Sequence, residues 1–319
     1  MTESTAPTRP LTGALLVLSA AALWGSLGLF GRRLFAYHLT PLEIASARAA
    51  LAFLGLAILF APRVRGLHVP WREVPLLLVY GGLSIGVFYF LYMAAIERTT
   101  IAVAAALLYT APAFVLVISW GLRWEAVRPV QLVPLAAALT GVVLVTGGGA
   151  AVVRGGAPLP AGAVAFGLGS GITYALFTVL GKRVTERYGP LRTLFYAYGA
   201  GVLVLAPAAP PWQVLAHHPD ALPVLAGMSL GPTLLASFLF LAALHHLPAS
   251  TASMLATAEP VVAALLGVAV LGEPLGLDTA AGVALVVAAA IMLGGAARAR
   301  SRRSAAKPSI DHPAAESGG

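Results

Sequence analysis

The sequence has no cysteine and very little charge. None of its 319 residues is Cys, and only 10% are Asp, Glu, Lys or Arg. The lack of cysteine excludes disulfides, thiolate metal sites and cysteine nucleophiles. The lack of charge excludes an ordinary soluble domain, because about 25% of the residues of such a domain are charged. With 59% hydrophobic residues and a mean hydropathy of +0.88, the chain must turn its apolar surface toward something other than water.

The motifs of several enzyme and pump classes are also missing. The sequence contains no Walker motif or other phosphate-binding loop, and no Ser, His and Asp arrangement typical of a hydrolase. The pairs His217-His218 and His245-His246 do not have the spacing of metal ligands. We therefore expect no enzymatic activity, no ATP-driven pumping, and neither a cofactor nor a metal.

Ten apolar runs dominate the chain. They cover residues 11–34, 41–60, 74–96, 101–121, 129–147, 161–184, 191–206, 221–244, 249–271 and 279–295. A run of about 20 apolar residues crosses the hydrocarbon core of a bilayer as a helix, whereas membrane-barrel strands are shorter and alternate in polarity. The first run is too long for the apolar part of a signal peptide and lacks a good cleavage site. The sequence therefore predicts an all-α integral membrane protein with ten transmembrane helices.

The positive residues are distributed unevenly over the two sides of this predicted bundle. If the N-terminus lies inside, fifteen of the 20 lysines and arginines fall on the inner side, four fall on the outer side, and Arg48 lies within a helix. Cytoplasmic loops are enriched in Lys and Arg. We therefore predict a multi-pass plasma-membrane protein with cytoplasmic N- and C-termini. The same distribution explains the net charge of +8 without a nucleic-acid partner.

The two halves of the chain resemble each other at an offset near 150 residues. Pro112 and Pro260 each lie thirteen residues before a glutamate, and Ala94-Ala95 recurs as Ala242-Ala243. Because five helices is an odd number, the second half must enter the membrane from the opposite side, and such inverted repeats are typical of secondary transporters. The predicted parts are an N-terminal tail (1–10), a first five-helix repeat (11–147), a linker (148–160), a second five-helix repeat (161–295) and a disordered basic C-terminal tail (296–319).

Three stretches resemble a known family. They are Leu23-Trp24-Gly25-Ser26, Arg48-Ala49-Ala50, and the stretch from Ser253 through Glu259-Pro260 to Leu271-Gly272-Glu273. In their order and duplication they resemble the EamA branch of the drug/metabolite transporter superfamily, over about residues 11–295. The first-half counterpart of Leu-Gly-Glu departs from the pattern as Arg123-Trp124-Glu125. The resemblance implies ten helices, cytoplasmic termini, a central cavity lined mainly by helices 1–4 and 6–9, and the export of small metabolites.

Two charged residues lie deep within predicted spans. Glu259 is near the middle of the ninth run, where a carboxylate is costly unless it is paired, solvated or protonated. It could bind a substrate ammonium or exchange a proton, or it could be a structural group beside Pro260. Arg48 lies in the second run and could hold a substrate carboxylate through a bidentate pair, or it could bond to backbone carbonyls. A direct Glu259–Arg48 ion pair is a further alternative.

Prolines and aromatic residues complete the candidate site. Pro112 and Pro260 each remove a backbone donor within a predicted span. We expect them to act as hinges or helix breaks, with a static bend as the alternative. Aromatic residues with a polar edge suit a cavity for amphipathic metabolites, although those near helix ends could instead form an interfacial belt. The aromatic candidates are Trp24, Tyr89, Tyr92, Tyr109, Tyr174 and Tyr196, of which Trp24, Tyr109 and Tyr174 are the strongest.

The sequence is best explained by a secondary active transporter that exports amino-acid-like metabolites or drugs by alternating access. Its partners would be a small-molecule substrate and the lipid bilayer, with proton coupling and homodimer formation both compatible with the sequence. Two alternatives are a non-transporting scaffold or channel and a membrane enzyme acting on lipids. An enzyme would need a cluster of His, Asp or Glu at the membrane interface, and the short loops lack one.

Overall fold

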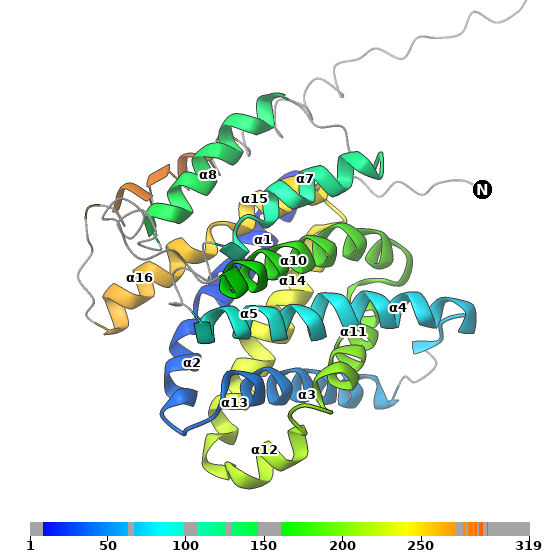
Figure 1. Ribbon diagram of the computed structural model, residues 1–319. Helices are drawn as coiled ribbons and strands as arrows, with labels where there is room; N and C mark the ends of the chain where they lie inside the picture. The colour runs from blue at the N-terminus through cyan, green and yellow to red at the C-terminus, as the bar shows by residue number, and fades with distance from the viewer. Residues whose placement is uncertain are drawn as a thin grey trace, which may run out of the picture.

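The computed structural model describes residues 9–62, 67–98, 107–124, 129–145 and 161–271, with single residues and short groups between 277 and 292. These residues form helices and short connections, and they include no strand (Figure 1). Five helices are long and apolar enough to cross a membrane: Pro10–Phe35, Pro41–Phe60, Trp71–Ala95, Ala161–Tyr188 and Pro219–Ala243. The predicted linker at 148–160 and tail at 296–319 lie outside the described residues, as do Glu125 and Glu273.

The first half contains helices that are divided into shorter pieces. Its elements are α1 (Pro10–Gly25), α2 (Leu27–Phe35), α3 (Pro41–Phe60), η2 (Trp71–Glu73), α4 (Val74–Gly81), the π-helix η3 (Gly82–Val87), α5 (Phe88–Arg98), α7 (Ala111–Gly121), η4 (Pro129–Gln131) and α8 (Leu132–Val145). Elements η2, α4, η3 and α5 follow one another without a gap, so the third apolar run is one span with a local change of helix type.

The second half follows a similar plan. Its elements are α10 (Ala161–Tyr188), α11 (Pro190–Leu205), α12 (Pro211–His217), η5 (Pro219–Ala221), α13 (Leu222–Met228), the π-helix η6 (Ser229–Leu235), α14 (Ala236–Ala243), α15 (Ala249–Ala256) and α16 (Glu259–Leu271). A short apolar helix, Ala280–Ala289, follows. The seventh run is short because α11 ends just before Pro207, and Pro211 begins α12.

Two helices are broken at matching places, and threonine hydroxyls stabilise the breaks. A turn at Tyr109-Thr110 precedes α7, and a turn at Thr257-Ala258 separates α15 from α16. The Thr110 hydroxyl donates to the Leu107 carbonyl and the Thr257 hydroxyl donates to the Met254 carbonyl, each at 2.6 Å. Proline occupies the second position of each following helix, where its missing N–H leaves no intrahelical bond unmade. The prolines therefore begin new half-helices after a break.

The third spans of the two halves share a second irregularity. Both contain a π-helical segment, η3 and η6, in which the backbone pairs with a wider spacing than in an α-helix. Residues 82–87 and 230–235 differ by 148, which is also the offset between Ala94-Ala95 and Ala242-Ala243. The likeness between the halves thus extends from sequence to backbone geometry.

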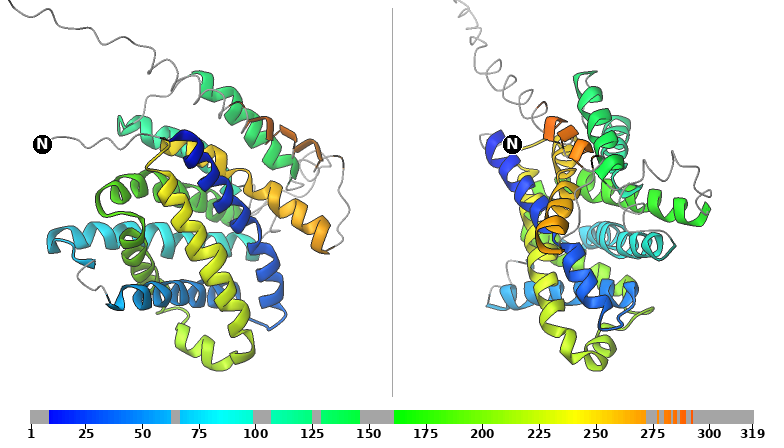
Figure 2. Two further views of the ribbon diagram at one scale, coloured as in Figure 1. Left: turned by 180° about the vertical axis from the view of Figure 1, so that it is seen from behind. Right: turned by 90° about the vertical axis from the view of Figure 1, so that its left-hand side faces the viewer.

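The helices of the two halves are interleaved in space. Helix α1 packs along α14 and against α15 and α16, and the view from behind shows α1 beside α14 (Figure 2). Helix α10 packs correspondingly against α5 and α7, while α11 packs against α3, α4 and η3. Consequently, the main core is formed by residues of helices that are far apart in the sequence, including Trp24, Tyr80, Tyr198 and Phe240.

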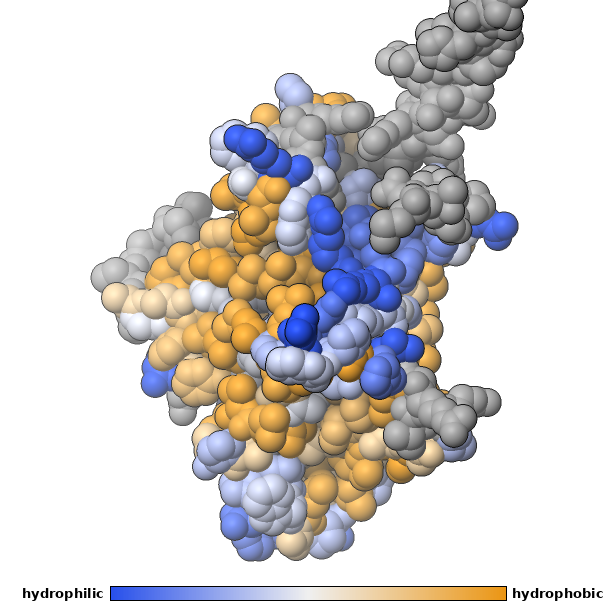
Figure 3. Space-filling view, turned by 90° about the vertical axis from the view of Figure 1, so that its right-hand side faces the viewer, coloured by the Kyte–Doolittle hydropathy of each residue, from blue (hydrophilic) through white to orange (hydrophobic). Residues whose placement is uncertain are grey.

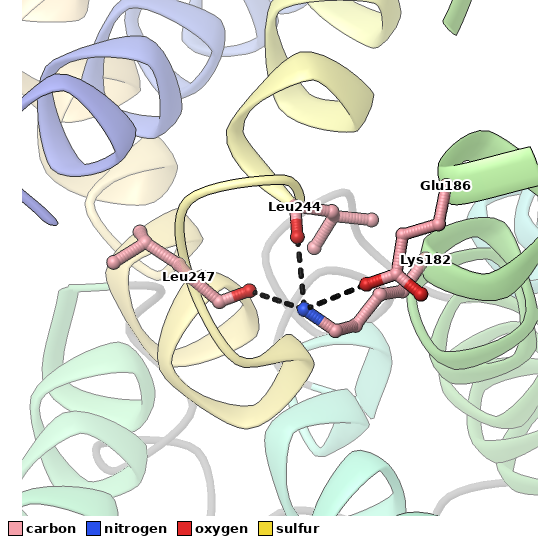
Figure 4. Close-up of polar contacts among 4 residues, drawn as sticks. All are labelled: Lys182, Glu186, Leu244 and Leu247. Carbon is pink, nitrogen blue, oxygen red and sulfur yellow. Dashed lines mark hydrogen bonds and ion pairs between the residues drawn. The ribbon is translucent and has the colours of Figure 1, made fainter. Parts of the chain in front are cut away.

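Charged side chains join the helix ends on one side of the bundle. Lys182 Nζ donates to the carbonyls of Leu244 and Leu247, both at 2.9 Å, and lies 3.4 Å from a Glu186 carboxylate oxygen (Figure 4). A cation at this place satisfies the carbonyls left unpaired where α14 ends. The face where α4 begins and α10 ends bears a band of hydrophilic residues flanked by apolar ones (Figure 3).

On this same side, Arg187 pairs with Glu73, and Arg192 Nη1 donates to the His68 carbonyl at 3.1 Å. These contacts connect the start of the third span with the connection between α10 and α11. The two sequence segments were both predicted to lie inside from their positive charge, and they meet at one end of the bundle.

Glycine allows the closest approach between the two halves. Gly81 of α4 faces the backbone of α11, and a Cβ atom added there would lie 2.4 Å from Ala197 Cα and 2.6 Å from its carbonyl oxygen. Backbone atoms cannot move aside as a side chain can, so only glycine fits at this contact.

We expect Gly81→Ala to lower the free energy of unfolding by about 1–3 kcal/mol, the usual cost of overpacking. Gly82→Ala is the matched control, because its added methyl would meet only Val204 Cγ2 at 3.6 Å and both glycines already have helical backbone angles. Thermal unfolding of the detergent-purified variants measures the difference. Equal stability of the two variants would contradict the close contact between α4 and α11.

Candidate functional site

Glu259 is the first residue of α16, directly after the turn at Thr257-Ala258. Its carboxylate interacts with the Tyr109 hydroxyl, which belongs to the matching turn before α7. The partial positive charge of a helix N-terminus favours a carboxylate at this position. The two helix breaks therefore bring Tyr109 and the acidic group together.

Arg48 lies in α3 and is buried, with 6% of its surface exposed. Its guanidinium carbon is 4.0 Å from the centroid of the Tyr89 ring, close enough for a cation–π interaction. Its Nε is buried and has no hydrogen-bond partner among the described residues. A buried donor without a partner destabilises a structure unless something else pairs with it.

Arg48 and Glu259 are near each other without touching. The charge of Arg48 acts on the Glu259 carboxylate, yet no ion pair joins the two within the part of the chain that the structure describes. The alternative of a direct Glu259–Arg48 ion pair is therefore not realised in this conformation. The Tyr89 ring lies against the guanidinium, and the Tyr109 hydroxyl interacts with the carboxylate.

Aromatic side chains pack around these two charges. The Trp24 ring lies 6.0 Å from Tyr174 in an edge-to-face arrangement and 5.3 Å from Phe240, measured between centroids. Tyr174 also lies 5.8 Å from Phe88, and its hydroxyl is close enough to Glu259 to interact electrostatically. The rings come from α1, α5, α10 and α14, so both halves of the chain form this cluster.

The structure brings together six of the residues that the sequence analysis singled out as candidates for binding or coupling. They are Trp24, Arg48, Tyr89, Tyr109, Tyr174 and Glu259. The Tyr196 hydroxyl instead donates to the Leu67 carbonyl at 2.9 Å. Pro112 and Pro260 lie beside them, because each begins a half-helix directly after one of the facing turns. Tyr174 and Glu259 are each partly exposed, so the protein does not completely enclose the cluster.

Tyr92, another aromatic candidate of the sequence analysis, is influenced by the charges of both Glu259 and Arg48. Two further residues of the cluster, Tyr198 and Phe240, were not among those candidates. Tyr198 is influenced by the charge of Arg48. Phe240 packs on Trp24 and on Tyr174. The repeat offset is a signal that could have found them, because Tyr198 lies 150 residues after Arg48, and Phe240 lies 148 residues after Tyr92.

Comparison with known proteins finds a family that matches both halves of this chain. The sequence model of the EamA-like transporter family matches residues 11–147 and again residues 161–295. The chain is 31% identical to an uncharacterized transporter of Archaeoglobus fulgidus, over 66% of this chain and 74% of that protein. It is 28% identical to the uncharacterized transporter YwfM of Bacillus subtilis, over 92% of this chain and 97% of that protein.

A relative with a named substrate is the threonine/homoserine exporter RhtA of Escherichia coli strain K12. The identity is 27%, and the match covers 82% of this chain and 83% of the exporter. One solved crystal structure superposes with a TM-score of 0.71 at 19% identity, covering 90% of this chain and 98% of that chain. At that identity the structural likeness supports the fold alone.

Proposed function

The chain belongs to the EamA-like transporter family, and from this premise we propose that it is a secondary active transporter that exports amino-acid-like metabolites or drugs. One observation carries the proposal. A guanidinium and a carboxylate from different halves lie near each other, without an ion pair between them, beside two facing helix breaks. Such a pair of opposite charges can bind the two charged groups of an amino acid.

The ligand chemistry follows from the two charged groups. The Arg48 guanidinium can donate to a substrate carboxylate, because its Nε has no hydrogen-bond partner among the residues that the structure describes. The Glu259 carboxylate can accept hydrogen bonds from a substrate ammonium. The rings of Trp24, Tyr89, Tyr109 and Tyr174 can contact the rest of the substrate. The name of the RhtA relatives, threonine/homoserine exporter, supports an amino-acid-like substrate.

The ten-helix inverted repeat is part of this proposal. Three pairings support it: the breaks before α7 and α16, the π segments η3 and η6, and the helix contacts. The contact of α1 with α14 corresponds to that of α10 with α5 when the halves are exchanged. Symmetry of this kind lets one chain adopt two states that open to opposite sides.

Alternating access would use the breaks as joints. The half-helices α7 and α16 each follow a turn that only a few hydrogen bonds stabilise, including the threonine hydroxyl bonds at 2.6 Å. Pro112 and Pro260 prevent the α-helix from closing across those turns. We propose that α7 and α16 tilt at these joints, and that Glu259 moves with α16 because it is its first residue.

We also propose a membrane orientation, from the positions of the basic residues. The contacts of Lys182, Arg187 and Arg192 gather basic residues at one end of the bundle. A basic end faces the cytoplasm in most membrane proteins. This end would therefore lie inside, with both termini, in the plasma membrane.

Counterflow in proteoliposomes tests the proposed function. Vesicles loaded with one amino acid of a broad panel should take up its labelled form in exchange. We expect Glu259→Gln and Arg48→Ala to reduce this exchange by about 10- to 100-fold, since a hydrogen bond to a charged group contributes about 1.5–3 kcal/mol. Lys182→Ala is the control, because Lys182 bonds to carbonyls at the end of the bundle.

Each other outcome has a separate meaning. Exchange that survives in both site variants would leave a carrier but remove Glu259 and Arg48 from its binding site. A wild-type protein that exchanges no member of the panel would contradict the transporter proposal and favour a scaffold.

Proton coupling adds a second prediction. If a proton and a substrate ammonium compete for Glu259, the apparent affinity of the wild type for substrate should fall as the pH is lowered, because a protonated carboxyl has lost its negative charge. Glu259→Gln resembles the protonated form and should show weak affinity with no dependence on pH. Half-saturation measured by counterflow, across mildly acidic to mildly basic pH, distinguishes the two. If the apparent affinity of Glu259→Gln still depended on pH, the proton would have to bind to another group.

A further inference from the structure

Two exposed tryptophans follow prolines at repeated positions in the chain. Pro70-Trp71 lies in the connection between α3 and α4, and Pro211-Trp212 lies 141 residues later, where α12 follows α11. Trp71 is 77% exposed and Trp212 is 64% exposed. Tryptophan is enriched where an apolar phase meets water, because its ring is apolar and its N–H needs a polar partner.

The two connections that bear these tryptophans are held in equivalent ways. The Tyr196 hydroxyl of α11 donates to the Leu67 carbonyl at 2.9 Å, four residues before the first tryptophan. Ser46 of α3 lies 150 residues before Tyr196, and its hydroxyl donates to the Ala209 carbonyl at 2.6 Å, three residues before the second tryptophan. Each connection is therefore bonded to the second long helix of the opposite half.

The connections lie at opposite ends of one helix pair. Helices α3 and α11 pack against each other; the first connection leaves the end of α3 and bonds near the start of α11, while the second leaves the end of α11 and bonds near the start of α3. Figure 1 accordingly shows the start of α4 at the right of the bundle and α12 at its lower end. With 20 and 16 residues, α3 and α11 are about 30 Å and 24 Å long, which is comparable to the hydrocarbon core of a bilayer.

The opposite face of each connection is packed into the bundle. Val69, two residues before the first tryptophan, is buried with Leu77 and Val184. Val214, two residues after the second tryptophan, is buried in a cluster that includes Ile44. The valines hold both connections against the protein, and the tryptophan rings are turned outward.

The charges beside the two tryptophans differ. The guanidinium carbon of Arg72 lies 5.6 Å from the centroid of the Trp71 ring, and Arg192 donates to the His68 carbonyl of the same connection at 3.1 Å. Residues 206–221, around Trp212, contain no Lys or Arg. Basic residues near a membrane surface attract anionic lipids. The Trp71 end therefore complements anionic headgroups, and the Trp212 end lacks this charge.

We propose that Trp71 and Trp212 are paired membrane-interface anchors, which mark the two lipid–water boundaries of the protein, and that the Trp71 end binds anionic phospholipid headgroups. Each indole N–H bonds to lipid oxygens while its ring rests on the upper part of the acyl chains. The hydroxyl bonds from Tyr196 and Ser46 connect the anchors to α11 and α3. The bilayer would thereby hold α3, which bears Arg48, at a fixed depth.

Quenching by brominated lipids tests the depth of each ring. Wild type, Trp71→Phe and Trp212→Phe are reconstituted in vesicles whose phospholipids carry bromine either close to the headgroup or near the end of the acyl chain. The fluorescence difference between wild type and each variant gives the contribution of that tryptophan. We expect bromine close to the headgroup to quench each contribution about twofold more strongly than deep bromine, because tryptophan sits at headgroup level.

Other depths contradict the proposal. Phenylalanine keeps a ring at these exposed positions, so both variants should fold. A tryptophan that iodide in the water quenches and brominated lipid does not would face water or a protein partner, which would overturn its assignment. Equal or stronger quenching by deep bromine would overturn it as well.

A comparison of brominated phosphatidylglycerol with brominated phosphatidylcholine tests the lipid class. We expect the Trp71 contribution to show about a two- to fivefold preference for phosphatidylglycerol, and the Trp212 contribution to show none. Arg72→Gln should lower the preference, whereas Gln213→Ala, the matched change beside Trp212, should not alter it. A Trp71 contribution without preference would overturn the anionic headgroup site. These measurements need no substrate, so their outcome is independent of the proposed transport.

Discussion

A carboxylate inside an apolar helix bundle needs a favourable polar environment, which at Glu259 includes a helix N-terminus and the neighbouring Tyr109 hydroxyl. This constraint explains the break between α15 and α16. An unbroken helix would use its backbone N–H groups internally and offer Glu259 no favourable end. The turn at Thr257-Ala258 creates that end, and the equivalent turn before α7 brings Tyr109 to face it.

Each half of the chain contributes groups to the candidate site that the other half does not supply. The first half contributes the guanidinium of Arg48 and the hydroxyl of Tyr109, and the second half contributes the carboxylate of Glu259 and the ring of Tyr174. The breaks that hold the acidic group are also the places where the backbone is least regular. Binding and movement are therefore proposed to share the same few residues, so that occupation of the site can influence the orientation of α7 and α16.

Much of this arrangement could be predicted from the sequence because the bilayer imposes a strong pattern. Long apolar runs predicted the five helices that are long and apolar enough to cross a membrane. The family resemblance drawn from the Trp24 and Glu259 stretches was confirmed by the match over residues 11–147 and 161–295. Charge and polarity in an apolar setting are rare, which is why Arg48 and Glu259 stood out. Their aromatic neighbours were predicted because rings with a polar edge suit a cavity for amphipathic metabolites.

Other features depend on tertiary structure that no local pattern records. Pro112 and Pro260 indicated irregular helices, but the turns are also stabilised by threonine hydroxyls bonded to carbonyls three residues earlier. The π segments η3 and η6 have no simple sequence signature. The absence of a direct Arg48–Glu259 ion pair depends on how α3 is rotated relative to α16, since Arg48 turns toward Tyr89 instead.

An experimental structure with a transported amino acid bound would test most directly whether the two charged groups form the binding site. We expect the substrate carboxylate at about 3 Å from the Arg48 guanidinium, and its ammonium at a similar distance from Glu259. An amino acid bound away from both groups, with Arg48 still against Tyr89 and Glu259 still beside Tyr109, would contradict that assignment.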